Sequence, residues 1–138
     1  MGLTATRLAR PTVDLRRIRT FYEHVVGMTV LGDFADHDGF DGVIFGLFGG
    51  RTQLELVHSP HHDVPSPSAE DALVLYHDSV DAAAELTARL RAGGAHEVAA
   101  DDATLNPYWP RTGSTVFVDP DGYRLIVSVD HDIGPEMP

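Results

Sequence analysis

Asp119-Pro120-Asp121-Gly122-Tyr123 lies between two short apolar segments near the C-terminus, and it is the stretch that decides the fold. Pro120 presets the φ angle of the second position of a type I turn, and aspartate is favoured at the first. Gly122 accepts the positive φ that such hairpin turns usually need next. Segments of strand length, rich in β-branched residues, flank the stretch at 115–118 and 124–129. The stretch therefore predicts an antiparallel hairpin.

The pattern of this last strand occurs once earlier in the chain. Gln53–His58 follows a Gly-Gly pair much as the last strand follows the Asp-Pro-Asp-Gly turn. Aligning Leu54 with Leu125 places Glu55 at the position of Ile126. Such internal repetition indicates two copies of one unit, each made of a strand, a helix and three strands.

The first copy is expected to span about 6–58. Asp14 is a suitable N-cap for a helix, and Gly27 suits its left-handed C-cap. Apolar residues recur at helical spacing between them: Leu15, Ile18, Phe21, Tyr22, Val25 and Val26. The predicted strands of this copy are 6–13, 28–34, 43–48 and 53–58. Pro11 implies an edge position or a bulge for the first of these strands.

The second copy is expected to span about 72–129, after a linker rich in proline and serine at 59–71. It begins with a strand at 72–77, and Asp78 is the predicted cap of the following helix. The apolar face of that helix comprises Val80, Ala83, Ala84, Thr87 and Leu90, and Gly93-Gly94 ends it. A short strand at 96–100 and a long loop at 101–113 precede the hairpin.

Length and composition fit a single domain. The 138 residues, 43% of them hydrophobic, suffice for one domain at 1–138 or for two small modules that share one core. No segment approaches transmembrane length and the N-terminus lacks a signal-peptide pattern, so we expect a cytoplasmic location without membrane contact. The absence of cysteine excludes disulfides, thiolate metal sites and cysteine nucleophiles.

The charge and the missing motifs exclude several function classes. The net charge of −11 argues against nucleic acid as a partner, because phosphate binding needs a basic face. It suits a cationic ligand through long-range attraction, although acidity also serves solubility alone. The chain has neither a Gly-x-Ser-x-Gly nucleophile motif nor a phosphate-binding loop that ends in Lys-Ser/Thr.

Asp14-Leu15, then Phe21-Tyr22, Gly27 and finally Asp119–Gly122 occur in an order that resembles the glyoxalase/bleomycin-resistance/dioxygenase family, also called the vicinal oxygen chelate superfamily. The resemblance covers the chain from about Thr6 to Val129. It implies an α+β fold of two βαβββ modules whose eight strands form a cup-shaped mixed sheet. For metal-dependent members it implies a divalent ion held by side chains of the first, fourth, fifth and eighth strands.

Only one of the metal-ligand positions that the resemblance implies carries a side chain able to coordinate an ion. These positions fall on Arg7, Glu55, Ala72 and Ile126. A carboxylate suits a divalent ion, whereas arginine never offers a lone pair and aliphatic side chains have none. We therefore expect no bound metal and no cofactor.

Glu55 lies among apolar strand residues, and a buried carboxylate needs a partner. Arg7 occupies the other family position in the same module and is expected to pair with Glu55 through both guanidinium branches. Arg10 is a rival partner, because Pro11 can shift the strand register. The pair is interpreted as a clamp for an anion or carbonyl group or as a site that orients a polar ligand. The structural alternatives are an ion pair at the base of the cup, or a Glu55 side chain that simply faces solvent.

Further candidates for the ligand site lie in the second module. Tyr108 and Trp109, held between prolines on the long loop, either wall a pocket or plug the open end of the module. His77 ends the fifth strand and either faces the cup or is a hydrogen-bonded structural residue. The histidines of the 59–71 linker are expected to be solvated rather than to form a metal site.

These features predict a homodimeric protein that binds a small organic ligand in a metal-free cup, for drug binding or sequestration. One alternative is a lyase, isomerase or dioxygenase of the same superfamily with an unorthodox site. Another is a structural or regulatory module whose cup is vestigial. The expected ligand-binding residues are Arg7, Arg10, Glu55, His77, Tyr108, Trp109 and Ile126.

Overall fold

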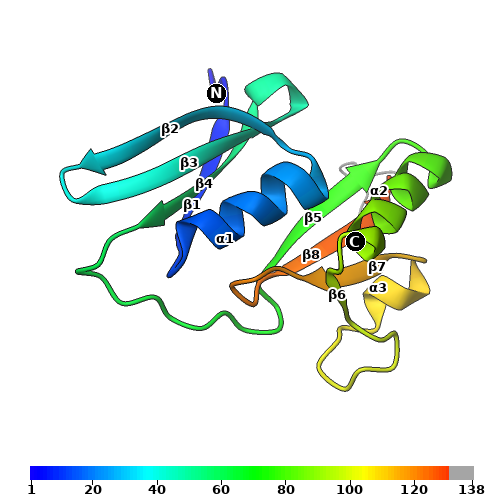
Figure 1. The fold of residues 1–138 in the computed structure, drawn as a ribbon. Helices are drawn as coiled ribbons and strands as arrows, with labels where there is room; N and C mark the ends of the chain where they lie inside the picture. Colours follow the sequence, from blue (N-terminus) through cyan, green and yellow to red (C-terminus); the bar gives the residue numbers. More distant parts are fainter. Residues whose placement is uncertain (131–138) are drawn as a thin grey trace. The chain divides into compact units, whose positions relative to one another are not determined.

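The chain folds into two compact units that repeat the same order of elements. The computed structural model describes residues 1–130, with one unit at Met1–Ser66 and the second from Pro67 onward (Figure 1). Each unit has a strand, a helical segment and three further strands, which form a mixed four-stranded sheet. The predicted α+β class with two βαβββ modules is thus confirmed. The assignment of both modules to a single domain stays a prediction.

The first unit carries its helical segment on one face of its sheet. Its elements are β1 (Thr6–Pro11), α1 (Leu15–Thr20), the π-helix η1 (Phe21–Val26), β2 (Thr29–His37), β3 (Phe40–Leu47), a short 3-10 helix η2 (Phe48–Gly50) and β4 (Thr52–His58). The strand order is β1-β4-β3-β2, with β1 parallel to β4. Pro11 ends the edge strand β1, where its missing N–H disturbs no ladder.

The helical segment of the first unit is closed by the two residues predicted to cap it. The Asp14 carboxylate accepts a hydrogen bond from the N–H of Arg17 at 3.1 Å, and Gly27 follows η1 with a left-handed φ of 89°. Buried side chains of α1 and η1 pack on those of β3 and β4: Ile18, Phe21, Tyr22, Val26, Val43, Phe45, Leu54 and Leu56. Each such burial contributes about 1.5–3 kcal/mol, so this layer holds the unit together.

The second unit repeats this layout with a more regular helix. Its elements are β5 (Ala72–His77), α2 (Val80–Ala92), β6 (His96–Glu97), α3 (Tyr108–Arg111), β7 (Thr115–Val118) and β8 (Arg124–Val129). The strand order is β5-β8-β7-β6, with β5 parallel to β8 (Figure 1). Neither unit contains, within residues 1–130, a helix with the length and hydropathy of a membrane span.

The start of α2 differs from the sequence prediction. Ser79, and not Asp78, is the N-cap, because its hydroxyl accepts a hydrogen bond from the N–H of Ala82 at 3.1 Å. The predicted apolar face is wrong at Val80, which is 70% exposed, and at the exposed Ala84. Its buried members are Ala83, Thr87 and Leu90. Helical spacing predicts an apolar stripe, but it does not reveal where the sheet beneath the helix ends.

The C-terminal hairpin forms as predicted. The N–H of Gly122 donates to the carbonyl oxygen of Asp119 at 3.0 Å, and the φ of Gly122 is 93°. The Asp119 carboxylate also accepts the N–H groups of Asp121 and Tyr123, at 2.9 and 3.0 Å. Because these bonds fix the turn, they also fix the register of β7 against β8.

The register of the two parallel strand pairs confirms the internal repeat. The Cα of Arg7 is paired with that of Gln53, and the Cα of Ala72 with that of Arg124. Gln53 and Arg124 each precede the aligned leucine of the sequence repeat by one residue. The two modules therefore have matching faces, position by position.

Candidate functional site

The face of the first sheet that is turned away from α1 carries the predicted polar pair. Side chains along a strand alternate between the two faces of a sheet. Leu54 and Leu56 of β4 are buried on the α1 side, so the residues between and beside them lie on the opposite side, which we call the open face. The register adds alternate residues of β1 to this face. The open-face residues of β1 and β4 are Arg7, Ala9, Pro11, Gln53, Glu55 and Val57.

Arg7 connects two acceptors on the open face. Its Nη1 donates to Glu55 Oε1 at 3.0 Å, and its Nε donates to Gln53 Oε1 at 2.8 Å. The Gln53 amide in turn donates to the carbonyl oxygen of Gly50 at 2.9 Å. Within residues 1–130, the second carboxylate oxygen of Glu55 accepts no hydrogen bond. A donor on a ligand therefore finds a free acceptor beside a guanidinium that is already held in place.

This ion pair is the one that the sequence predicts, but it is less buried and is joined through one guanidinium branch only. The side chains of Arg7 and Glu55 are 45% and 18% exposed. Water reaches the guanidinium because β1 is the edge strand of its sheet. Such a pair contributes only about 0.2–1 kcal/mol to stability, so it matters more as a fixed polar surface than as a structural support.

Arg10 is not the partner of Glu55. Its Cα is paired with that of Leu56, so its side chain lies on the α1 side of the sheet. Its Nη2 donates to the phenol oxygen of Tyr22 at 2.7 Å, and its guanidinium carbon lies 5.8 Å from the centre of that ring. Both residues are buried. Arg10 thus ties the sheet to the helical segment and adds no charge to the open face.

The second unit has a cavity of about 200 Å³ that joins two of the predicted site residues, Trp109 and Ile126. Ile126 is buried in a cluster with Leu105, and Trp109 packs against that cluster. Trp109 packs on the apolar face of the sheet and lines a cavity, and its role toward a ligand stays a prediction. The other residues that line the cavity include Glu70, Ala72, Val74, Asn106 and Arg124.

Arg124 is a cationic side chain at this cavity that sequence reasoning missed. Its Nη2 donates to the Thr104 hydroxyl at 2.6 Å, and no carboxylate of residues 1–130 forms an ion pair with it. The Thr104 hydroxyl and N–H both donate to Asp102, and these bonds, the hydroxyl first, lower the pKa of the Asp102 carboxyl. In the sequence, the signal for Arg124 was its position two residues before Ile126, because residues two apart on a strand lie on the same side of the sheet.

Tyr108 lies beside Trp109 but does not line the cavity. The two rings meet edge to face with their centres 4.9 Å apart, and Tyr108 is 39% exposed.

Burial raises the pKa of Tyr76, and the charges of Tyr108 and Asp130 add to this effect. The Tyr76 hydroxyl therefore stays protonated, and able to donate a hydrogen bond, to a higher pH than an ordinary tyrosine.

His77 lies on the other side of this sheet from Ile126. The Thr115 hydroxyl is 2.9 Å from that of Thr87 on α2, which identifies the α2 side of the sheet. Strand alternation through the paired register places His77 on that same side. Its Nδ1 is 3.1 Å from the carbonyl oxygen of Ser128, so it has the structural hydrogen bond that the sequence left as one alternative.

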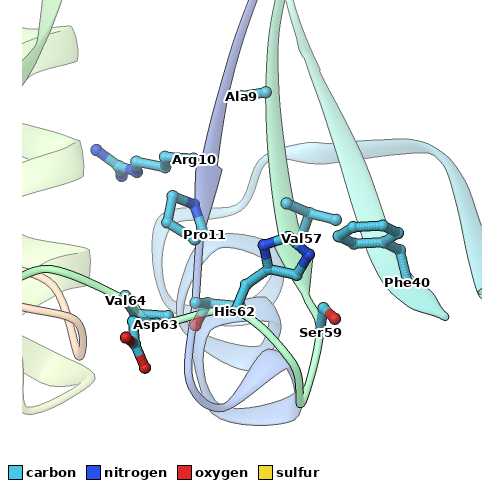
Figure 2. A pocket seen from close by; sticks show the side chains of 10 residues that line it. Ala9, Arg10, Pro11, Phe40, Val57, Ser59, His62, Asp63 and Val64 are labelled. Carbon is cyan, nitrogen blue, oxygen red and sulfur yellow. The ribbon is translucent and has the colours of Figure 1, made fainter.

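The first unit has a further cavity, of about 270 Å³, that sequence reasoning did not find. Figure 2 shows strand residues and residues of the segment after β4 around it: Ala9, Pro11, Phe40, Val57, Ser59, His62 and Asp63. Ala9 is paired with Glu55, so the cavity adjoins the polar pair on the open face. No periodic pattern links Phe40 to a linker histidine, and only the fold brings them together.

The residues at the metal-ligand positions do not fit a metal ion. The Arg7 guanidinium has no lone pair and is bonded to Glu55, while Ala72 and Ile126 present only hydrocarbon to their cavity. No three His, Asp or Glu side chains of the described part of the chain converge as metal ligands do, and this includes the linker histidines. These four positions therefore lack the set of lone-pair donors that a divalent metal ion needs.

Family models and a curated relative match most of the chain. Residues 6–57 match the YycE-like N-terminal domain, and residues 70–128 match the YycE-like C-terminal domain. The uncharacterized protein YycE of Bacillus subtilis (strain 168) is 36% identical over 121 residues, which are 87% of this chain and 84% of that protein.

Solved structures agree with these matches. A crystal structure of a YycE protein of unknown function from Bacillus subtilis, described as a candidate glyoxalase/fosfomycin resistance protein, has a TM-score of 0.85 at 32% identity. The match covers 97% of this chain and 95% of that one. TnmS3, an antibiotic binding protein from Streptomyces sp. CB03234, has a TM-score of 0.67 at 26% identity. The match covers 95% of this chain and 99% of TnmS3. A glyoxylase/bleomycin resistance protein/dioxygenase domain shares the fold.

Proposed function

This chain belongs to the YycE-like family of the glyoxalase/bleomycin-resistance superfamily, and on that premise we propose that it binds a small organic molecule through its own side chains. The observation that carries the proposal is the chemistry of the side chains at the positions that the family resemblance assigns to metal ligands. Arg7 and Glu55 form a polar pair with a free carboxylate oxygen, and Ala72 and Ile126 line a cavity beside Trp109. Apart from the Glu55 carboxylate, these side chains offer no lone pair to a metal ion, whereas polar pairs and apolar walls are features of sites for organic ligands.

The cavity beside Trp109 suits an unsaturated ring with a polar substituent. The indole offers a flat face, and Val74, Leu105 and Ile126 form the apolar part of the wall. Glu70, Asn106 and Arg124 supply polar groups of the kind that fix the orientation of a ligand in such sites. A volume of about 200 Å³ is below the range of whole drug-sized sites, so the cavity takes one ring system of a larger molecule.

The biological role that fits best is drug binding and sequestration. TnmS3, at 26% identity, is an antibiotic binding protein. Holding a toxic compound requires a complementary surface and no reacting group. A lyase, isomerase or dioxygenase function has less support, because the side chains at its usual metal positions offer no set of lone pairs. A homodimeric state and a cytoplasmic location stay predictions, which sedimentation and cell fractionation test.

Trp109 provides the test, because it is the single tryptophan of the chain. We expect at least one compound from a panel of ring-containing antibiotics to change its fluorescence saturably at micromolar concentration. The Trp109→Phe variant, followed by equilibrium dialysis, should bind that compound several-fold more weakly, because the smaller ring removes part of the wall. Tyr108→Phe is the matched control and should bind it normally.

No saturable fluorescence change and no retention of any compound in dialysis would contradict the proposed function. It would leave the 101–113 loop as a structural cover of the second sheet, which is the vestigial alternative.

A further inference from the structure

We infer that the cavity of the first unit is a separate binding site, and that it takes a cationic amine with an apolar or aromatic body. It lies in a different unit from the cavity beside Trp109 and is independent of the proposed function. A preformed wall, an aromatic surface and an unpaired carboxylate support a binding site here.

The wall of this cavity is preformed by a short turn after β4. Ser59 is buried, its carbonyl oxygen accepts the N–H of His62 at 3.3 Å, and its hydroxyl accepts the N–H of His61 at 3.3 Å. This turn carries the His62 ring to Phe40, with the ring centres 5.3 Å apart and the planes inclined by 38°. Figure 2 shows the His62 ring beside Val57, between Pro11 and Phe40. The turn therefore closes one side of the cavity without a ligand.

The other walls are apolar and aromatic. Pro11, Val57 and Phe40 are half-buried, so burying them further against a ligand removes apolar surface from water. The face of the Phe40 ring carries partial negative charge, which attracts a cation. A volume of about 270 Å³ accommodates one substituted ring but not a whole drug-sized molecule.

Asp63 is the acidic residue of this cavity. It is exposed at the rim, where Figure 2 shows its carboxylate directed away from Phe40 and His62, and among residues 1–130 the carboxylate has no hydrogen-bond or ion-pair partner. Arg10 also borders the cavity, but Figure 2 shows its guanidinium pointing away from Phe40 and His62, and it donates to Tyr22 on the α1 side. The chain's net charge of −11 raises the local concentration of cations as well. An ammonium group satisfies Asp63, whereas an anion meets repulsion.

The test uses three probes of one shape on isotope-labelled full-length protein. Benzylamine is cationic at neutral pH, benzyl alcohol is neutral and benzoate is anionic. Amide chemical shifts are followed during titration of each probe. Benzylamine should shift the amides of Phe40, Ser59 and residues 61–64 saturably, benzyl alcohol should do so more weakly, and benzoate should not. Raising the salt concentration should weaken benzylamine binding, because screening reduces the attraction of exposed charges.

The Asp63→Asn variant removes the negative charge of the side chain and keeps its shape. It should weaken benzylamine binding about two- to fivefold, the range of an exposed ion pair, and leave benzyl alcohol binding unchanged. Asp101→Asn makes the same change of net charge at an exposed residue of the second unit and should have no effect. Equal binding of all three probes, an unchanged benzylamine affinity in Asp63→Asn, or shifts confined to other residues would overturn the inference. Fluorescence of Trp109 reads the other cavity, so either proposal can fail without the other.

Discussion

Arg7 Nη1 donates to Glu55 Oε1 across 3.0 Å on an exposed edge of the first sheet, with its Nε engaged by Gln53 at 2.8 Å. A buried pair would lose about 3–5 kcal/mol on removal of one partner, because the other charge would be left without water. This pair keeps contact with water, so its stability contribution is small and its geometry is available to a ligand.

Arg7→Met and Glu55→Gln should each lower the free energy of unfolding by about 1 kcal/mol or less, as expected for an exposed pair. The double variant should show a coupling energy within the same limit. Urea denaturation of both single variants and the double variant measures this. A loss above about 3 kcal/mol for Arg7→Met alone would mean that the carboxylate is buried after all.

Tyr22→Phe should be far more costly than its size suggests. It removes the acceptor of the 2.7 Å hydrogen bond from the buried Arg10 guanidinium, and bonds to charged groups contribute about 1.5–3 kcal/mol. Tyr108→Phe, at a 39% exposed position, should change stability by less than about 0.5 kcal/mol. Denaturation midpoints of the two variants provide the comparison, and equal midpoints would rule out a structural role for the Arg10–Tyr22 bond.

Two glycines of the first sheet should respond differently to alanine. A Cβ at Gly42 would lie 2.2 Å from the Phe34 ring, its cross-strand neighbour, whereas a Cβ at Gly32 would meet nothing within 4 Å. Gly42→Ala must therefore displace an aromatic ring and should cost about 1–3 kcal/mol. Gly32→Ala should be neutral or slightly stabilising, because it only restricts the unfolded chain. Thermal melts test this, and an equal response would show that the ring does not pack on Gly42.

Glu97 should add an acid-dependent contribution to stability. Hydrogen bonds from Arg91, at 2.7 and 2.9 Å, lower the pKa of Glu97 below its ordinary value of 4.5, although burial opposes the shift. A depressed carboxyl pKa stabilises the fold above the unfolded value and loses this effect as pH falls through the folded value. The melting-temperature gap between the wild-type protein and Glu97→Gln should therefore be largest near pH 7 and shrink as the pH falls below 4.5. A gap that stays constant with pH would contradict the assignment.

Glu85→Gln is the matched control for this experiment. It changes the same residue type on the exposed side of α2, and within residues 1–130 its side chain has no hydrogen bond or ion pair. Its melting-temperature gap should be small at every pH.

Sequence reasoning reached the fold because the signals that specify it are local. The Asp119 turn, the Asp14 cap and the strand repeats each act within a few residues, and the alignment of Leu54 with Leu125 proved to be in register. Pro11 correctly indicated an edge strand. The π-helical widening at Phe21–Val26 left no trace in the apolar spacing.

The site was reached only in part, because burial and side-chain direction depend on distant contacts. The pairing of Arg7 with Glu55 follows from strand positions, but its exposure follows from the edge location of β1. The cavity beside Phe40 and His62 forms because the turn after β4 packs on a strand, and no pattern in the sequence predicts that contact. The ligand roles of Arg7, Glu55 and Trp109 stay predictions.

The central claim is that this chain binds an organic molecule with its own side chains and needs no metal. The direct measurement is a calorimetric titration of chelator-treated protein with a compound that alters Trp109 fluorescence, compared with protein incubated with zinc, nickel, manganese or iron. We predict one-to-one binding with the same dissociation constant in every preparation. Binding that disappears on metal removal and returns with one of these ions would contradict the claim.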